Sequence, residues 1–201
     1  MRKHPNLIKG IDVHRPEQLW VADITYVAIS DRYWYLHLIT DAYSKRINGV
    51  LYQRDSGCQP HIEGFYYSFE KNLKYKGSLI HHSDRGLQYC SAGYVKMLQQ
   101  NSIGISMTED GSPYDNAIAE RVNGILKDEY GLDKEFTDLS QLQTRVKQSI
   151  ECYNNRRPHE SNHLLTPNEM HKQHKLRPKA WHKKSTTTLA GSCGFSPSLQ
   201  Y

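Results

Sequence analysis

The chain has 201 residues and a mass of 23.3 kDa, which is enough for one packed domain with extensions but too small for two full-sized domains. Only 37% of its residues are hydrophobic, its mean hydropathy is -0.74, and no apolar run approaches the roughly 20 residues of a membrane-spanning helix. This composition excludes a transmembrane helical protein. Because the first ten residues show no secretory signal, we expect the chain in the cytoplasm.

The cysteines and the distribution of charge further limit the kinds of site that the chain can contain. The four scattered cysteines form no CxxC pair, which argues against a zinc ribbon, a redox motif or a disulfide framework. The 26 Lys and Arg residues outnumber the 21 Asp and Glu residues, and the excess lies in residues 171–201, which carry no acidic side chain. A basic tail attracts a polyanion such as DNA by counterion release, but it would also serve as a solubilising tail. Composition leaves both interpretations open.

Three segments rich in β-branched and aromatic residues, 19–29, 33–40 and 47–52, predict strands joined by short turns. Such consecutive strands form an antiparallel meander. We expect the first strand to be buried on both faces. We also expect the aromatic run from Tyr33 to Tyr35 to fill the faces of the sheet rather than to stack on bases.

Helical and strand patterns alternate in the next part of the chain. They predict a helix at 60–74, a strand at 78–82, a helix at 92–101 and a strand at 103–107. Gly and Pro then indicate a loop at 108–113. The element order is therefore three strands followed by alternating helices and strands.

Two amphipathic helices come after this loop. Asp115 is the expected N-cap of the first helix, in which Glu120, Asn123 and Lys127 lie away from the apolar face. That apolar face comprises Ile118, Val122, Ile125 and Leu126. The second helix spans 138–153, and its apolar stripe comprises Leu139, Leu142, Val146, Ile150 and Tyr153. The Ser, Thr and Gly content of residues 185–198 predicts disorder.

Three acidic residues are candidates for chemistry. Asp23 lies in the middle of an apolar strand, where an ionised carboxylate is unfavourable unless it is paired or binds a metal. Asp84 follows a short apolar strand, at the end where α/β sheets present functional side chains. Glu120 lies near the start of a helix. Each alone has an ordinary structural explanation, but together they supply hard oxygen ligands, which favour Mg²⁺ over zinc.

The spacing of these acids and the residues around them carry a family resemblance. Sixty residues separate Asp23 from Asp84, and 35 separate Asp84 from Glu120. The surrounding motifs are VADITY at 21–26, HHSDRGLQY at 81–89, SPYDNAIAERVNGILKDE at 112–129 and YNNRRPHESNHLLTPNEM at 153–170. In motifs and spacing the chain resembles the DDE transposases of the insertion sequence 3 family, which are relatives of retroviral integrases. The resemblance covers roughly residues 15–172.

The resemblance implies an α/β architecture of the RNase H-like fold, with a five-stranded mixed sheet flanked by helices and a C-terminal helical and basic extension. In that fold the first and fourth strands are neighbours, which would bring Asp23 and Asp84 together beneath the helix that carries Glu120. By the same resemblance these three acids are catalytic and bind two Mg²⁺ ions, or Mn²⁺ in their place, for two-metal phosphoryl transfer. The implied reactions are nicking at the end of a mobile element and attack of the freed 3′-hydroxyl on a phosphodiester.

Five further residues are candidate DNA contacts, namely Lys127, Arg121, Asn116, Arg156 and Arg157. Lys127 lies two helical turns after Glu120 on the same face, and the corresponding position of the related integrases is also basic. The two arginines at 156 and 157 suit phosphate binding. A basic loop stabilised by Glu160 is an equally good interpretation of them.

We expect residues 1–17 to be a linker remnant, 18–170 to be the integrase-type catalytic core, and 171–201 to be a basic, disordered tail. The resemblance implies insertion-element ends and target DNA as partners, a homo-oligomer on DNA, no membrane, and a location in the cytoplasm at the nucleoid. The helix-turn-helix region usual in the family does not fit ahead of Asp23. An upstream helix-turn-helix subunit or a frameshift fusion would then complete the recognition of DNA ends.

Three functions therefore stay open at this point. The first is an active transposase catalytic subunit, which the complete acidic triad favours. The second is a truncated, non-catalytic remnant that binds DNA or partner subunits, which the short segment ahead of Asp23 favours. The third is an RNase H-type nuclease acting on RNA–DNA hybrids, against which the motif at 153–170 argues.

Overall fold

The computed structural model describes residues 4–54, 78–109 and 116–179. Outside these residues lie the predicted helix at 60–74, most of the predicted loop at 108–113, the predicted N-cap Asp115 and the predicted disordered segment 185–198.

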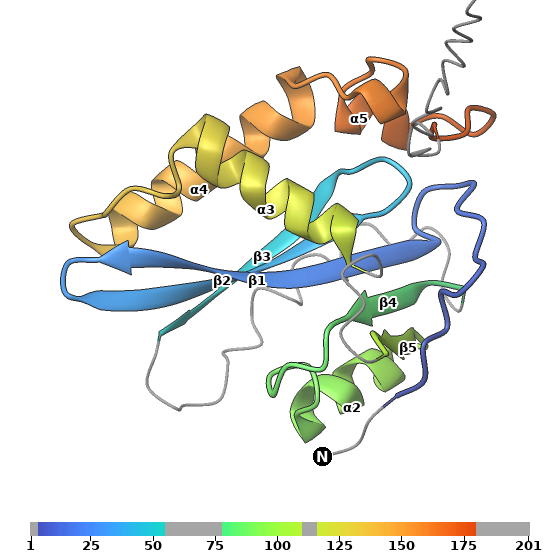
Figure 1. Cartoon of the computed structure of the whole chain (residues 1–201), viewed down its shortest axis with the longest axis horizontal. Helices are drawn as coiled ribbons and strands as arrows, with labels where there is room; N and C mark the ends of the chain where they lie inside the picture. Colours follow the sequence, from blue (N-terminus) through green and yellow to red (C-terminus); the bar gives the residue numbers. More distant parts are fainter. Residues whose placement is uncertain (1–3, 55–77, 110–115, 180–201) are drawn as a thin grey trace, which may run out of the picture.

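The centre of the fold is a five-stranded sheet with the order β3-β2-β1-β4-β5 (Figure 1). The strands are β1 (Leu19–Ile29), β2 (Arg32–Asp41), β3 (Ile47–Arg54), β4 (Ile80–Ser83) and β5 (Gly104–Met107). The first three pair antiparallel, whereas β4 pairs parallel with both β1 and β5. The predicted meander and the mixed five-stranded sheet are thus confirmed.

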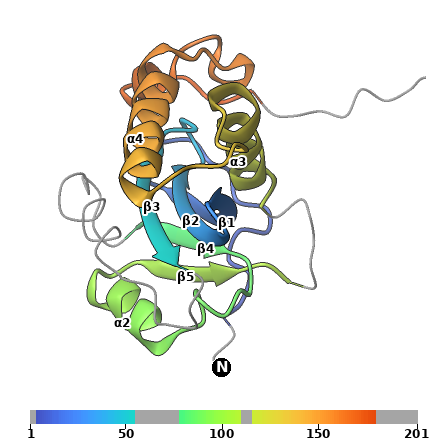
Figure 2. The same cartoon turned by 90° about the vertical axis from the view of Figure 1, so that its left-hand side faces the viewer.

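Helices cover both faces of this sheet, as Figures 1 and 2 show. On one face lies α2 (Ala92–Gln100), and on the other lie α3 (Ala117–Tyr130), α4 (Leu139–Arg156) and the short α5 (Pro167–His171). Side chains alternate along β1, so Trp20 and Ala22 pack with α2 whereas Val27 and Ile29 pack with α3 and α4. None of the helices in the described part of the chain is long and apolar enough to cross a membrane.

The prediction that β1 is buried on both faces is wrong for the second half of the strand. β4 pairs only with Leu19 to Ala22, so β1 continues beyond its neighbour. As a result Tyr26 is 59% exposed, and Tyr33, its diagonal neighbour on β2, is 55% exposed. Tyr33 therefore does not fill a face of the sheet as predicted, while Trp34 packs against the α3 and α4 layer as expected.

The two long helices form where their apolar stripes predict them. α3 starts after Asn116, one residue later than predicted, and ends at Gly131, whose φ of 71° is the left-handed conformation that glycine adopts without strain. α4 starts at the N-cap Asp138, whose side chain accepts a hydrogen bond from the Gln141 amide. Its predicted stripe is confirmed, since Leu142, Val146 and Tyr153 are fully buried.

The segment after α4 packs around the turn between β2 and β3. The Tyr153 hydroxyl donates to the Lys45 carbonyl at 3.0 Å, and the Asn162 amide donates to the Ser44 carbonyl at 2.6 Å. The Tyr43 hydroxyl in turn donates to the Leu176 carbonyl at 2.7 Å. Packing therefore continues past residue 170, the predicted end of the core.

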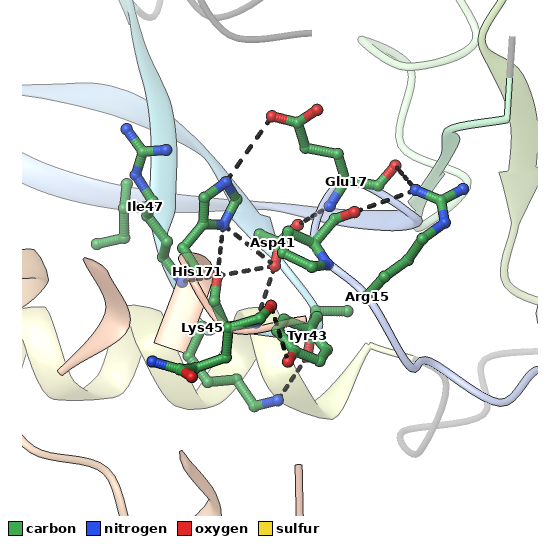
Figure 3. A network of polar contacts seen from close by, with 12 residues as sticks. Arg15, Glu17, Asp41, Tyr43, Lys45, Ile47 and His171 are labelled. Carbon is green, nitrogen blue, oxygen red and sulfur yellow. Dashed lines mark hydrogen bonds and ion pairs between the residues drawn. The ribbon is translucent and has the colours of Figure 1, made fainter. Parts of the chain in front are cut away.

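A buried ionic network joins this turn to α5 and to the segment before β1 (Figure 3). The Asp41 carboxylate is fully buried and accepts hydrogen bonds from the amides of Glu17 and Ser44 and from the Ser44 hydroxyl, each at 2.8 Å. His171 of α5 lies 3.8 Å from both Asp41 and Glu17. Burial alone would raise the pKa of Asp41, but His171 and the surrounding N–H groups overcome it and hold that pKa below its usual value.

Candidate active site

The sheet places Asp23 and Asp84 side by side. The register of the parallel pair β1 and β4 runs from Leu19 opposite Ile80 to Ala22 opposite Ser83. Asp23 and Asp84 are the next residues on the two chains, and equivalent positions of neighbouring parallel strands project toward the same face. Two acids that are 61 positions apart in the sequence therefore become neighbours, as the resemblance implied.

Asp23 is a half-buried carboxylate with limited support from the protein. Burial raises its pKa above the usual value, and the negative charge of Asp84 raises it further. The side-chain amide of Asn123 on α3 donates to Asp23 Oδ2 at 2.8 Å, and this hydrogen bond works in the opposite direction. The Ile24 amide and the charge of Lys127 also lower the pKa, but burial and Asp84 outweigh all three influences, so a bound cation would stabilise this pair of carboxylates.

Asp84 is held by the turn that follows β4. Its Oδ1 accepts a hydrogen bond from the Gly86 amide at 2.9 Å. A Cβ atom on residue 86 would lie only 2.9 Å from that same oxygen. Glycine at this position thus lets the backbone approach the carboxylate closely enough to orient it.

Helix α3 packs on β1 and is fixed to it by two asparagines. Asn116, which is 5% exposed, donates to the Ala22 carbonyl at 3.1 Å, and Asn123 donates to Asp23. Glu120 is exposed and lies one helical turn before Asn123. Within the described ranges no three His, Cys, Asp or Glu side chains are close enough to share a metal ion. The structure thus brings Asp23 and Asp84 together but does not gather Glu120 with them.

Lys127 lies near the aspartates, two turns farther along α3. Its ammonium group is 4.3 Å from the centre of the Tyr26 ring, a cation–π contact. Its positive charge also acts on Asp23, whose pKa it lowers against the larger effect of burial. Among the predicted DNA contacts, Lys127 is therefore a basic residue whose charge acts on the Asp23 carboxylate.

The remaining basic residues have different surroundings. Arg157 forms a bidentate pair with Glu129 at the end of α3, with both N···O distances at 2.6 Å. The alternative that Glu160 stabilises this arginine is wrong, because Glu129 is its partner. This hydrogen-bonded pair holds the pKa of Glu129 below its usual value, with a further contribution from Arg121. Arg121 and Arg156 are both exposed.

Sequence reasoning overlooked Asn123 as a functional residue. It falls three positions after Glu120 and is 6% exposed, between the buried Val122 and the half-buried Gly124. A polar side chain that the packing of a helix buries requires a partner. The sequence offered one signal for this residue, since Asn123 lies within the motif 112–129 and directly follows the apolar Val122.

Comparison with known proteins agrees with this geometry. Two models of the integrase core domain match the chain, one over residues 13–113 and the other over residues 101–167. The chain belongs to the integrase core family. The transposase for insertion sequence element IS904 of Lactococcus lactis subsp. lactis is 31% identical to this integrase-core chain over 172 residues, covering 84% of the chain and 67% of that protein.

The 31 kDa protein of insertion element IS600 of Shigella sonnei is 34% identical over 142 residues, covering 70% of this chain. The match includes 52% of that protein, so this integrase-core chain spans about half the length of such curated relatives.

Solved structures confirm the RNase H-like fold of this integrase core. The HTLV-2 integrase catalytic core domain in complex with magnesium aligns with a TM-score of 0.56 at 19% identity, covering 78% of this chain and 97% of that chain. The simian T-cell lymphotropic virus intasome, in complex with a PP2A regulatory subunit, aligns with a TM-score of 0.66 at 19% identity. That alignment covers 94% of this chain and 64% of the viral chain.

Proposed function

We propose that this chain is the catalytic core of an insertion-sequence transposase, which cleaves DNA strands and transfers them with the help of a divalent metal. The observation that supports this function best is the Asp23 and Asp84 pair, brought together by the β1 and β4 register beneath a helix that carries Glu120. The identity to insertion-sequence transposases supports the same reaction class.

The donor set fits Mg²⁺. Asp23 and Asp84 offer hard carboxylate oxygens, and their mutual repulsion in a partly buried place favours a cation. The magnesium named for the HTLV-2 integrase core is consistent with this choice. When bound, the metal would supply an activated oxygen nucleophile and stabilise charge on the leaving 3′-oxygen. We propose that Glu120 completes the ligand set and that two ions bind, with Mn²⁺ able to replace Mg²⁺.

The other residues orient these acids or contact DNA. Asn123 fixes the Asp23 carboxylate, and the Gly86 amide fixes Asp84. Among the five candidate DNA contacts, Lys127, Arg121 and Arg156 are best placed to reach phosphates. Asn116 and Arg157 already hydrogen-bond to Ala22 and Glu129, and we propose that they act mainly by placing α3.

The decisive experiment is metal-dependent cleavage and rejoining of a branched DNA that resembles an integration product. Such a substrate tests the chemistry without depending on recognition of element ends. Wild-type protein is compared with Asp84→Asn, Glu120→Gln and the control Glu151→Gln, whose acid is exposed on α4. We expect wild type and the control to cleave and rejoin with Mg²⁺ or Mn²⁺, and both site variants to lose activity.

Folding is verified for each variant by circular dichroism before activity is compared. An inactive, folded wild type would favour the non-catalytic remnant, while cleavage of RNA–DNA hybrids without strand transfer would favour the nuclease. Retained activity in Asp84→Asn would overturn the assignment of the site itself.

We further propose that the partners are the element ends and target DNA, that at least two copies assemble on DNA, and that an upstream helix-turn-helix subunit or fusion recognises the ends. DNA as substrate places the protein at the nucleoid in the cytoplasm. We propose residues 1–17 as a linker, 18–170 as the core and 171–201 as a basic tail whose first part contacts the core through His171 and Leu176. Sedimentation with and without DNA tests the assembly, and a monomer under both conditions would contradict it.

A further inference from the structure

Two exposed tyrosines form a pair on the β1–β2 hairpin, close to the proposed active site. Tyr26 and Tyr33 are 59% and 55% exposed, and their ring centres are 5.7 Å apart with an interplanar angle of 89°. They are diagonal neighbours on one face, because Tyr26 is opposite Tyr35 and Ala28 is opposite Tyr33. Figure 1 shows that this end of the hairpin extends beyond β4.

This pair lies beside the carboxylates but on the opposite face of β1. Tyr26 is three residues after Asp23, so the alternation of side chains directs the two residues to opposite faces. Between Asp23 and Val27, the edge of β1 toward β4 is unpaired in the part of the chain that the structure describes. The ammonium group of Lys127, on α3, lies 4.3 Å from the Tyr26 ring centre.

We propose that Tyr26 and Tyr33 are a stacking surface for an unpaired base of the DNA strand that enters the active site. The inference rests on the proposed function, since it assigns a second contact to the same substrate. Aromatic rings bind bases of any sequence by stacking, and a neighbouring cation holds the strand's phosphate. Tyr26 and Tyr33 supply the rings, and Lys127, whose charge also acts on Asp23, supplies the cation beside them.

The surroundings of the pair favour a nucleotide over other occupants. A tyrosine that only filled the core would be buried, whereas each of these side chains keeps more than half of its surface accessible. An apolar partner face would have to cover the Lys127 ammonium and lose its hydration, which is unfavourable. A phosphodiester strand instead complements that charge while its bases cover the rings.

The experiment measures binding without chemistry, in EDTA, so that the stacking contact is separated from catalysis. The probes are a DNA hairpin with an unpaired 2-aminopurine overhang at one end and the matched blunt hairpin. The protein variants are Tyr26→Leu, Tyr33→Leu and the ring-preserving Tyr26→Phe and Tyr33→Phe. Because both side chains are exposed, we expect all four variants to fold with unchanged circular dichroism and melting temperature.

We expect wild type and both Phe variants to quench the 2-aminopurine fluorescence and to bind the overhang DNA more tightly than the blunt DNA. The Leu variants should lose the quenching and bind the overhang DNA about tenfold more weakly, with blunt-end affinity nearly unchanged. Equal behaviour of Leu and Phe variants would overturn the inference while leaving the proposed function intact.

Two other outcomes would also overturn it. If wild type binds neither DNA, the proposed function fails together with the stacking surface. If the Leu variants instead convert a sedimenting dimer into a monomer without changing the preference for the overhang DNA, the tyrosine pair is an interface between two copies of the chain.

Discussion

Two aspartates of the same sheet, Asp23 on β1 and Asp41 at the end of β2, are stabilised in opposite ways. Asp41 is fully buried, yet its pKa is lowered, because burial is outweighed by His171 and by N–H groups of Ser44 and Glu17. Asp23 is less buried, yet its pKa is raised, because burial and Asp84 outweigh its hydrogen bond to Asn123.

The difference separates a structural carboxylate, Asp41, from one that we propose to be functional, Asp23. The protein itself supplies the cation and the donors that Asp41 needs, so nothing further has to bind there. At Asp23 and Asp84 the hydrogen bonds from Asn123, Ile24 and Gly86 and the charge of Lys127 do not offset burial and the repulsion between the two carboxylates, so the pKa of Asp23 stays raised and a bound cation would stabilise the site. The charges and hydrogen-bond donors that stabilise a carboxylate are therefore more complete at Asp41 than at the proposed active site.

The largest loss of stability should come from removing the Asp41 carboxylate, which the protein itself stabilises. Asp41→Ala would leave the Glu17 and Ser44 amides without their acceptor and His171 without one of its two buried acidic partners. We expect the free energy of unfolding to fall by about 3–5 kcal/mol, the cost typical of breaking a buried ion pair. Urea denaturation measures this change. A loss as small as that of an exposed substitution would show that the network contributes little.

The next largest effect is expected from a variant that tests whether DNA cleavage depends on the orientation of the Asp84 carboxylate. Gly86→Ala would place a methyl group 2.9 Å from Asp84 Oδ1, and the flexible carboxylate rather than the backbone would move. We expect DNA cleavage to fall about 10–100-fold, because small misplacements of reacting groups are costly, while unfolding changes by less than about 1 kcal/mol.

The matched control for that variant is Gly124→Ala, in the middle of α3, where the added Cβ meets nothing within 4 Å apart from its own chain neighbours and the nearby backbone of the helix. It should keep cleavage and gain up to about 1 kcal/mol of stability from the higher helix propensity of alanine. Equal activity of the two alanine variants would indicate that the orientation of Asp84 is not limiting.

The Asp23 and Asp84 site and the Asp41 network also differ in how much of each can be predicted from the sequence. Asp23, Asp84 and Glu120 could be proposed as a site because each lies within a motif of recognisable spacing, and the strands around the two aspartates have strong β patterns. The register that joins Asp23 to Asp84 then follows from the parallel pairing of β1 and β4.

The Asp41 network could not be predicted in this way. Asp41 follows an ordinary strand pattern, and His171 lies 130 positions later in a helix of only five residues. The Arg157 and Glu129 pair joins two helices that no local pattern brings together. Contacts of this kind depend on tertiary packing, whereas periodicity reports only on neighbours along the chain.

A smaller effect is a pH dependence of the network. Burial tends to lower the pKa of His171 and Arg46 lowers it further, but Asp41 and Glu17 raise it above the usual value overall. The histidine therefore stabilises the fold fully below about pH 6.5, its unfolded pKa, and this contribution is lost as pH rises through the higher folded pKa. Asp41 contributes above about pH 4, and its contribution is lost as pH falls through its lowered pKa.

Comparison of wild type with His171→Gln tests this window. The difference in unfolding free energy should be about 1 kcal/mol near pH 5 and should decline above neutral pH. His174→Gln, on an exposed neighbouring residue, serves as control and should show no such dependence. A difference for His171→Gln that stays constant from pH 5 to pH 9 would contradict a charged His171.

The smallest effect, and the one with opposite sign, is expected at Asp23. Asp23→Asn keeps an oxygen for Asn123 but removes the repulsion from Asp84 and the cost of burying a charge. Without metal we expect the variant to be as stable as wild type or more stable by up to about 1 kcal/mol. With Mg²⁺ the order should reverse, because only wild type gains the free energy of metal binding. Melting curves of both proteins with and without Mg²⁺ measure these differences. If the more stable of the two proteins is the same with and without Mg²⁺, Asp23 is not a metal ligand.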